Sequence, residues 1–310
     1  MKINSFCKLK DGLLLETDNG KMKLTPWEPD IIHIVYTLEK NFSTRDSLMV
    51  CGHPSYSFFW DVEEDETYIK MRTSKVQVLI NRMTGTFLYF DAAGRLLTKE
   101  PDSGGKTLVP VDVKISVFEE NSKVKSQETV DGVKDWVEDI KQVIDRKAYH
   151  TKLEFEWEEG EGLYGLGSHE EGYMNHRGKY QYLYQQNLKA VVPVLVSTKG
   201  YGILLDSYSF MIFRDNVYGS YIRTDVDDQM DYYFIYGPEF DDIIKNYRKL
   251  TGKAPLFPKW AYGYFQSKQR YKTQEELLSI VKEYRERKIP LDVIVLDWMS
   301  WPGNLWGQKS

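Results

Sequence analysis

The feature that most constrains the fold of this chain is a change in hydrophobic period near residue 240. Before that point, apolar and polar side chains alternate in several short segments, at residues 76–80, 111–117 and 153–157. A period of two places successive side chains on opposite faces of a β-strand, and it is expected where one face is buried and the other is wet. The first two thirds of the chain are therefore predicted to be antiparallel β-structure.

Turn signals separate these strands at short intervals. Met83-Thr84-Gly85 follows the first of them, and Ala92-Ala93-Gly94 follows a second one that contains Phe87 and Tyr89, so the three elements form a meander. The charged stretch 119–127 is predicted to be an exposed loop. Many short strands with turns between them favour a β-sandwich over a barrel with helices.

After residue 240 the spacing becomes helical and then alternates between strand and helix. Residues 240–250 place Phe240, Ile243, Ile244 and Tyr247 on one stripe, and Gly252 provides a stop. Further on, the sequence predicts a strand at 260–266, then a helix, then a strand at 292–297 that is apolar enough to be buried on both faces.

The helix between these two strands has its own start signal. Thr273 can cap it, with Glu276 at the spacing of a capping box. Leu277, Leu278, Val281 and Tyr284 give it an apolar face, and Ile289-Pro290 ends it. The predicted unit is therefore strand, helix, strand.

A parallel β/α barrel needs about 250 residues and eight such units. Only 55 residues follow Pro255, so one unit fits here. We expect the front end of a longer protein, with a β-sandwich domain at residues 1–254 and an incomplete barrel at residues 255–310. The predicted fold class is mainly β, a sandwich followed by the first βαβ unit of a truncated (β/α)8 barrel.

Composition narrows the class of protein further. The 41 basic residues do not outnumber the 46 acidic ones, which argues against a nucleic-acid partner. The sequence contains no apolar run of the roughly 18 residues that a membrane span needs, and its N-terminus lacks a secretory pattern. Two cysteines, Cys7 and Cys51, make no disulfide framework, so a cytoplasmic location is expected. The aromatic content of 14% suits either a β-rich core or stacking on sugars.

Three segments carry a family resemblance. They are YGLGSHEEG at residues 164–172, VPVLVSTKGYGIL at residues 192–204, and a series from residue 247 to 298 that includes PKWAYGYFQS and ends in LDW. In this order and spacing the chain resembles glycoside hydrolase family 31, the retaining α-glucosidases, α-xylosidases and related transglycosidases.

The resemblance implies a galactose-mutarotase-like β-sandwich packed on a catalytic (β/α)8 barrel. It also implies an aspartate nucleophile and an aspartate acid/base on later barrel strands, beyond Ser310. A retaining mechanism holds two such carboxylates about 5–5.5 Å apart. No catalytic residue is therefore expected in this chain, which alone should be inactive. The expected whole protein hydrolyses terminal α-linked xylose or glucose from oligosaccharides. The alternative is a non-catalytic carbohydrate-binding sandwich module.

The resemblance also implies a set of substrate-binding residues. Asp297, at the carboxyl end of the second barrel strand, matches a sugar-binding aspartate, and that end is where barrel active sites assemble. Trp298 lies beside the terminal sugar, where its size would favour xylose by filling the space of a C6 hydroxymethyl group. Trp301 is expected either to form an aromatic wall nearby or to pack beneath a barrel loop. Asp292, at the start of the same strand, is interpreted as structural.

Two further candidates lie earlier in the chain. Asn187 aligns with a loop of the sandwich that reaches the sugar site, where many α-glucosidases carry aspartate. Asparagine keeps an acceptor but loses the charge. Gln266, at the end of the first barrel strand, points at the same face. Ordinary structural roles stay open for both residues.

Metals, cofactors and nucleotides are not expected. His169, Glu170 and His176 lack the spacing of a zinc helix, and the aspartates at 225–231 lack the glycine and distant glutamate of a calcium loop, so a solvated turn is favoured there. The expected partner is an oligosaccharide substrate, with no nucleic acid and no membrane. Assembly into a homo-oligomer stays open.

Overall fold

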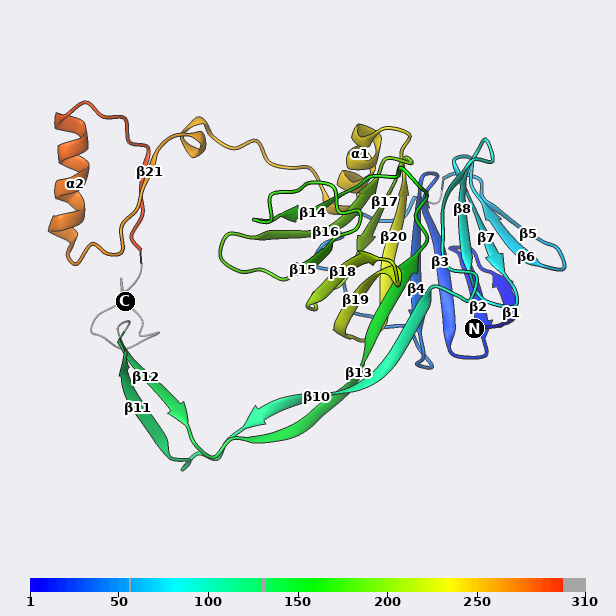
Figure 1. Ribbon diagram of the computed structural model, residues 1–310, viewed down its shortest axis with the longest axis horizontal. Helices are drawn as coiled ribbons and strands as arrows, with labels where there is room; N and C mark the ends of the chain where they lie inside the picture. The colour runs from blue at the N-terminus through cyan, green and yellow to red at the C-terminus, as the bar shows by residue number, and fades with distance from the viewer. Residues whose placement is uncertain (56, 130–131, 298–310) are drawn as a thin grey trace. The chain divides into compact units, whose positions relative to one another are not determined.

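The computed structural model describes residues 1–55, 57–129 and 132–297, and it divides into two compact units (Figure 1). The first unit comprises residues 1–113 and 144–253, and the second comprises residues 114–143 and 254–310. The predicted mainly β class is confirmed. No described helix is long and apolar enough to cross a membrane.

An eight-stranded antiparallel sheet forms the frame of the first unit. Its strand order is β1-β2-β3-β4-β20-β17-β16-β14, so the amino-terminal strands pair with later ones through β4 and β20. The bounds are β1 Ile3–Lys8, β2 Leu13–Thr17, β3 Lys21–Glu28, β4 Ile31–Thr37, β14 Leu163–Ser168, β16 Ala190–Ser197, β17 Tyr201–Leu205 and β20 Met230–Tyr236.

Two five-stranded sheets complete the β-structure of this unit. One is the expected meander, in the order β5-β6-β7-β8-β9, and the other has the order β10-β13-β19-β18-β15. The bounds are β5 Asp61–Glu64, β6 Tyr68–Arg72, β7 Val76–Asn81, β8 Phe87–Asp91, β9 Leu96–Lys99, β10 Lys106–Val117, β13 Lys141–Phe155, β15 Tyr180–Leu183, β18 Met211–Asn216 and β19 Gly219–Asp227.

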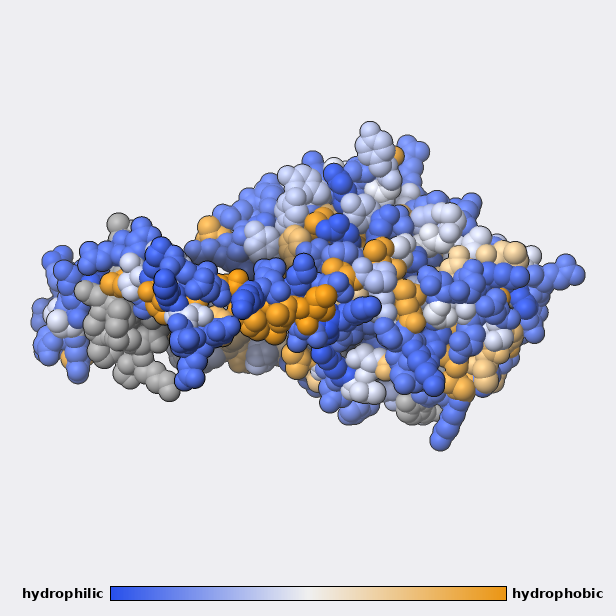
Figure 2. Space-filling model, turned by 90° about the horizontal axis from the view of Figure 1, so that it is seen from below, coloured by the Kyte–Doolittle hydropathy of each residue, from blue (hydrophilic) through white to orange (hydrophobic). Residues whose placement is uncertain are grey.

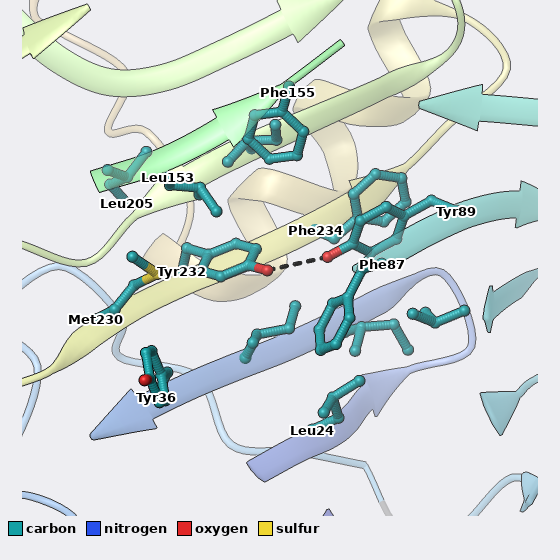
Figure 3. Packing of buried hydrophobic residues seen from close by; sticks show 14 of the residues in the cluster. Leu24, Tyr36, Phe87, Tyr89, Leu153, Phe155, Leu205, Met230, Tyr232 and Phe234 are labelled. Atoms are coloured by element: carbon teal, nitrogen blue, oxygen red, sulfur yellow. Dashed lines mark hydrogen bonds between the residues drawn. The ribbon is translucent and has the colours of Figure 1, made fainter. Parts of the chain in front are cut away.

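The core lies between these sheets and is rich in aromatic side chains. Tyr89 from β8 stacks on Phe234 from β20 with ring centroids 4.1 Å apart, and its hydroxyl lies 3.0 Å from that of Tyr232 (Figure 3). The hydroxyl pair satisfies two polar groups that burial would otherwise penalise. Much of the aromatic content therefore serves the core.

Helix α1, Phe240–Thr251, covers part of the other face of the eight-stranded sheet. The helix and its Gly252 stop are confirmed, with Gly252 at φ 79°. The predicted stripe is correct for Ile243, which is buried, but wrong for Phe240 and Ile244, which are 43% and 47% exposed, and Leu250 is buried outside it. The sheet face meets the side of the helix that also carries the buried Asn246.

The second unit contains the outer ends of β10 and β13 and a hairpin of β11, Val124–Thr129, and β12, Gly132–Val137. The loop predicted at 119–127 is exposed, but it ends where β11 begins. The strand predicted at 111–117 is present, whereas its predicted buried face is not, since Ile115 is 43% exposed. Figure 2 shows apolar residues at the surface along the outer ends of β10 and β13.

The same unit holds the predicted strand–helix–strand. β21, Phe265–Gln266, runs parallel to β22, Val293–Ile294, with α2, Gln274–Glu286, between them. The strand predicted at 260–266 is wrong in its first half, where a 3-10 helix, η1, spans Lys259–Tyr262. The strand predicted at 292–297 is shorter than expected and only half-buried.

Candidate functional site

The carboxyl ends of β21 and β22 bring two of the predicted site residues to one edge. Phe265 pairs with Val293 and Gln266 with Ile294, so the residues that follow both pairs leave the sheet on the same side. The amide of Val295 donates to the carbonyl of Gln266 at 2.9 Å. One step further, the Ser267 hydroxyl donates to Oδ2 of Asp297 at 2.9 Å, which links the two chain segments across the edge.

Three tyrosines hold the Gln266 amide at this edge. Its Oε1 accepts from the hydroxyls of Tyr264 and Tyr284, both at 2.6 Å, and its Nε2 donates to the Tyr271 hydroxyl at 3.1 Å and to the carbonyl of Ser267 at 3.2 Å. Two acceptor and two donor positions are the full capacity of an amide. The side chain therefore has a fixed orientation and braces the strand end from which Ser267 emerges.

Asp292 occupies the opposite end of β22. Its Oδ2 accepts from the Tyr264 amide at 3.1 Å, and this hydrogen bond links the residues just before β21 and β22. A Cβ at Gly263 would lie 1.9 Å from the same oxygen, so only glycine permits this approach. These contacts agree with the structural interpretation of Asp292.

Asn187 lies in the first unit, on the exposed loop between β15 and β16. Both ends of this loop are anchored. The Gln185 amide bonds the N–H and the carbonyl of Val191 at 3.0 Å each, and Lys189 Nζ contacts Glu171 Oε1 at 2.9 Å. The hydrogen bond from Lys189 holds the pKa of Glu171 at about 2. Asn187 therefore lies in a loop whose two ends are held by the contacts of Gln185 and Lys189.

The neighbouring segment 175–178 is part of the sandwich framework. The Arg177 guanidinium donates to Asp215 Oδ2 at 2.9 Å and to the carbonyls of Glu158 and Glu161 at 2.8 and 3.0 Å. His176 is buried and lies 3.1 Å from the carbonyl of Gly165, and burial lowers its pKa. No set of three or more metal-ligating side chains is arranged around an ion position in the described part of the chain.

Trp298 and Trp301 lie outside the described residues. Of the others, Gln266 and Asp297 belong to the second unit and Asn187 to the first. All five substrate-binding assignments stay predictions.

A cavity in the first unit was missed by the sequence reasoning. Its volume is about 980 Å³, and its lining comes from residues 23–53, Arg146 and residues 206–233. The aspartates at 225–231 were the available signal, but they were interpreted as a solvated turn. The turn is present between β19 and β20, yet Asp227, Asp228 and Asp231 also line this cavity.

Two family models match the chain. The glycosyl hydrolase 31 N-terminal galactose mutarotase-like domain matches residues 21–213, and the glycosyl hydrolases family 31 TIM-barrel domain matches residues 254–309. These matches confirm the predicted galactose-mutarotase-like sandwich and the start of a barrel.

Curated relatives cover different parts of the sequence. An alpha-xylosidase of Saccharolobus solfataricus is 48% identical over 177 residues, which are 54% of this chain and 24% of that protein. Alpha-glucosidase 2 of Bacillus thermoamyloliquefaciens is 25% identical over 310 residues, 95% of this chain and 34% of that protein. The chain therefore spans about a quarter of the first relative and about a third of the second.

Solved structures share the fold. The GH31 alpha-xylosidase from a soil metagenome, complexed with xylose, superposes with a TM-score of 0.74 at 23% identity, covering 97% of this chain and 42% of that one. The GH31 alpha-xylosidase from Xanthomonas citri superposes with a TM-score of 0.73 at 21% identity, covering 97% and 46%.

Proposed function

Because the chain belongs to glycoside hydrolase family 31, we propose that it is the N-terminal part of a retaining α-glycosidase that removes terminal α-linked xylose or glucose from oligosaccharides. The sandwich comprises residues 1–254 in this proposal, and the barrel begins at residue 255. The observation that carries it is the parallel pair of β21 and β22 with Asp297 just past the carboxyl end.

Asp297 is the proposed anchor of the terminal sugar. Active sites of β/α barrels assemble at the carboxyl ends of the strands, and Asp297 follows β22 there. An ionised carboxylate accepts charge-assisted hydrogen bonds from two adjacent hydroxyls. The hydrogen bond from the Ser267 hydroxyl to Oδ2 holds this carboxylate against the neighbouring strand end, which fixes its position at the edge.

The nucleophile and the acid/base are proposed to be aspartates encoded beyond residue 310. Retaining hydrolysis needs one carboxylate to attack the sugar while the other protonates the leaving oxygen, across about 5–5.5 Å. One strand–helix–strand unit supplies too few strand ends to assemble that pair. The 310-residue chain alone is therefore expected to be inactive.

Xylose is the preferred sugar in this proposal and glucose is the second choice. The 48% identity to a protein named alpha-xylosidase supports that order. Trp298 would exclude the C6 hydroxymethyl group of glucose, Trp301 would provide an aromatic wall, and Asn187 would contact the terminal sugar from the sandwich loop. Gln266 would support the edge that carries Ser267 and Asp297.

A cytoplasmic location is also proposed. Cys7 and Cys51 are both exposed and unpaired, and free exposed thiols suit a reducing compartment.

The test is to extend the reading frame past Ser310 and assay the longer protein on aryl α-xylosides and α-glucosides. Asp297→Asn should lower kcat/KM at least 100-fold, while Asp241→Asn, at the exposed start of α1, should leave it unchanged. Trp298→Ile should raise the glucoside-to-xyloside ratio. If Asp297→Asn kept the kcat/KM of the unchanged protein, the role of Asp297 as sugar anchor would be refuted. If Trp298→Ile left the glucoside-to-xyloside ratio unchanged, the argument for xylose would be refuted. Hydrolysis by the 310-residue chain would refute the placement of the catalytic pair. A stop codon after Ser310 would favour the non-catalytic module instead.

A further inference from the structure

The cavity of about 980 Å³ in the first unit is built on the eight-stranded sheet, on the same face that α1 partly covers. Its floor includes side chains of β3, β4 and β20, among them Thr25, His33 and Tyr233. Loops at residues 42–53 and 206–209 line its sides, together with the end of β19 and the turn after it at residues 226–229. This volume lies within the usual range of small-molecule sites, which are concave and combine apolar surface with a few polar groups.

An aromatic cluster supplies the apolar part of the floor. The His33 ring stacks on Tyr233 with centroids 4.1 Å apart and an interplanar angle of 5°. Trp27 meets both rings edge-on, at 5.9 Å from His33 and 5.4 Å from Tyr233. The three rings fix one another: Tyr233 is buried beneath His33, and the partly exposed Trp27 and His33 form a rigid surface at the base of the cavity.

Carboxylates surround this surface, and the structure pairs them in two ways. Asp228 contacts Arg146 and, at 3.0 Å, Arg45, while Asp231 Oδ1 lies 2.6 Å from His33 Nε2. Asp206 and Asp227 have no cation within ion-pair distance among the described residues. Their partners are hydroxyl groups instead.

Those hydroxyl contacts define the kind of donor that the cavity accepts. The Ser207 hydroxyl lies 2.9 Å from both oxygens of Asp227, and the Tyr208 hydroxyl donates to Asp206 Oδ1 at 3.2 Å. Each carboxylate has about four acceptor sites, so lone pairs are left for a ligand. Burial raises the pKa of Asp206, and it raises that of Asp227 to about 6. Hydroxyl groups are therefore the donors that both carboxyl groups accept in this structure.

We propose that this cavity is a second carbohydrate site, which binds a neutral saccharide between the Trp27–His33–Tyr233 cluster and the carboxyl groups of Asp206 and Asp227. Sugars combine apolar C–H faces with rows of hydroxyl donors, and the cavity combines ring surface with rows of oxygen acceptors. All of its lining residues belong to the first unit, so the site is separate from the strand ends that carry Asp297.

The test is isothermal titration calorimetry on the 310-residue chain with xylose, glucose, maltose and isomaltose, and with spermidine as a cationic probe. We expect saturable binding of at least one sugar and none of spermidine. Asp206→Ala and Asp227→Asn should each weaken sugar binding at least tenfold. Asp112→Asn, an exposed carboxylate of β10 outside the cavity, is the matched control. Thermal unfolding of every variant checks that it folds, and Tyr208→Ala serves as a second cavity variant if Asp227→Asn does not.

The calorimetry results decide between this cavity and the strand ends as the sugar site. Sugar binding lost in the cavity variants and kept in Asp112→Asn and Asp297→Ala supports the proposal. Loss in Asp297→Ala with retention in Asp206→Ala would assign the sugar to the strand ends and overturn it. No sugar binding by the folded chain, or tighter binding of spermidine than of any sugar, would also overturn it. The failure of this proposal leaves the proposed glycosidase function untouched, because the two are tested on different residues.

Discussion

At the scale of single residues, the stability of the sandwich depends on a buried ion pair between Glu100 and Lys106. Both side chains are fully buried, and Lys106 Nζ lies 2.5 Å from each carboxylate oxygen. The amide of Phe87 donates to Oε2 at 2.9 Å, and the ammonium lies 3.5 Å from the centre of the Phe87 ring. Burial raises the pKa of Glu100 and lowers that of Lys106, so each charge depends on its partner.

Lys106→Met is therefore expected to reduce the free energy of unfolding by about 3–5 kcal/mol, because it leaves a buried carboxylate without its cation. The double variant Glu100→Gln/Lys106→Met should recover part of that loss. Urea unfolding measures both. Lys99→Met is the matched control, since its ammonium contacts the half-exposed Glu156 at 2.8 Å and such pairs contribute about 0–1 kcal/mol. Equal losses in Lys106→Met and Lys99→Met would contradict the prediction.

Glu171 makes the stability of the Asn187 loop depend on pH. The hydrogen bond from Lys189 lowers the pKa of Glu171 from 4.5 to about 2 in the folded chain. A lowered carboxyl pKa stabilises the fold above the unfolded value, and this stabilisation is lost as the pH falls from 4.5 towards 2. The difference in Tm between the wild type and Glu171→Gln should thus be largest above pH 5 and vanish near pH 2. A Glu159→Gln control, on an exposed turn, should show no such trend; a constant difference across this range would argue against the prediction.

At the scale of elements, the alternation of apolar residues predicted strands better than it predicted their burial. In β7 the pattern matches the structure in full, since Val76, Val78 and Ile80 are buried. In β10 the same pattern continues through residues 111–117, yet the apolar side chains there are exposed or half-buried. A period of two fixes which side chains share a face, but the element that covers the face is decided by contacts distant in sequence.

The helices show the same division. The capping box of α2 was predicted from Thr273 and Glu276, and the Thr273 hydroxyl accepts from the Glu276 amide at 3.1 Å. The stripe of α1 was predicted from hydrophobicity alone, and of its members Ile243 is buried, but the sheet also buries Asn246 and Leu250, which the stripe did not include. Asn246 is included because its Nδ2 donates to the carbonyl of Tyr236 at 2.8 Å, a partner that no local pattern reveals.

Thr273→Ala is expected to destabilise the first turn of α2 by about 1 kcal/mol, because it removes the acceptor for the Glu276 amide. Hydrogen exchange of the amides in α2 measures this directly, and exchange at Glu276 should speed up about fivefold. Thr273→Ser keeps the hydroxyl and is the control. Similar exchange in the alanine and serine variants would rule out the cap as a source of stability.

At the scale of the whole molecule, the edge formed by the carboxyl ends of β21 and β22 could be predicted from the sequence, whereas the cavity could not. Parallel strands joined by a helix place their carboxyl ends together, so Gln266 and Asp297 could be assigned to one edge from local spacing. The cavity brings Trp27 and His33 of β3 and β4 together with Asp231 of β20 through the pairing of β4 with β20, and Arg146 joins them from β13 of another sheet. That pairing joins residues about 200 positions apart, and no short motif encodes it.

The two hydrophobic clusters of the sandwich lie entirely within residues 1–253. After that point Tyr271 and Leu291 are buried, but many apolar side chains of the described residues are exposed, among them Trp260, Tyr262 and Leu278 at 54%, 73% and 47% exposure. A chain that ends at Lys253 should therefore keep a cooperative urea transition with an unchanged midpoint. It should also bind less of an apolar dye such as anilinonaphthalene sulfonate than the 310-residue chain does.

A chain that ends at Glu239 is the matched control for this truncation. It also lacks α1, so it uncovers the sheet face where Ile243 and Leu250 are buried, and burying two such side chains is worth about 3–6 kcal/mol. Its midpoint should fall and its dye binding should rise. If the chain that ends at Lys253 behaved like this control, residues 254–310 would be part of the stabilising core, and the boundary proposed at residue 254 would be wrong. If it behaved as expected, the sandwich would be an independent folding unit, on which the cavity can be studied without the barrel.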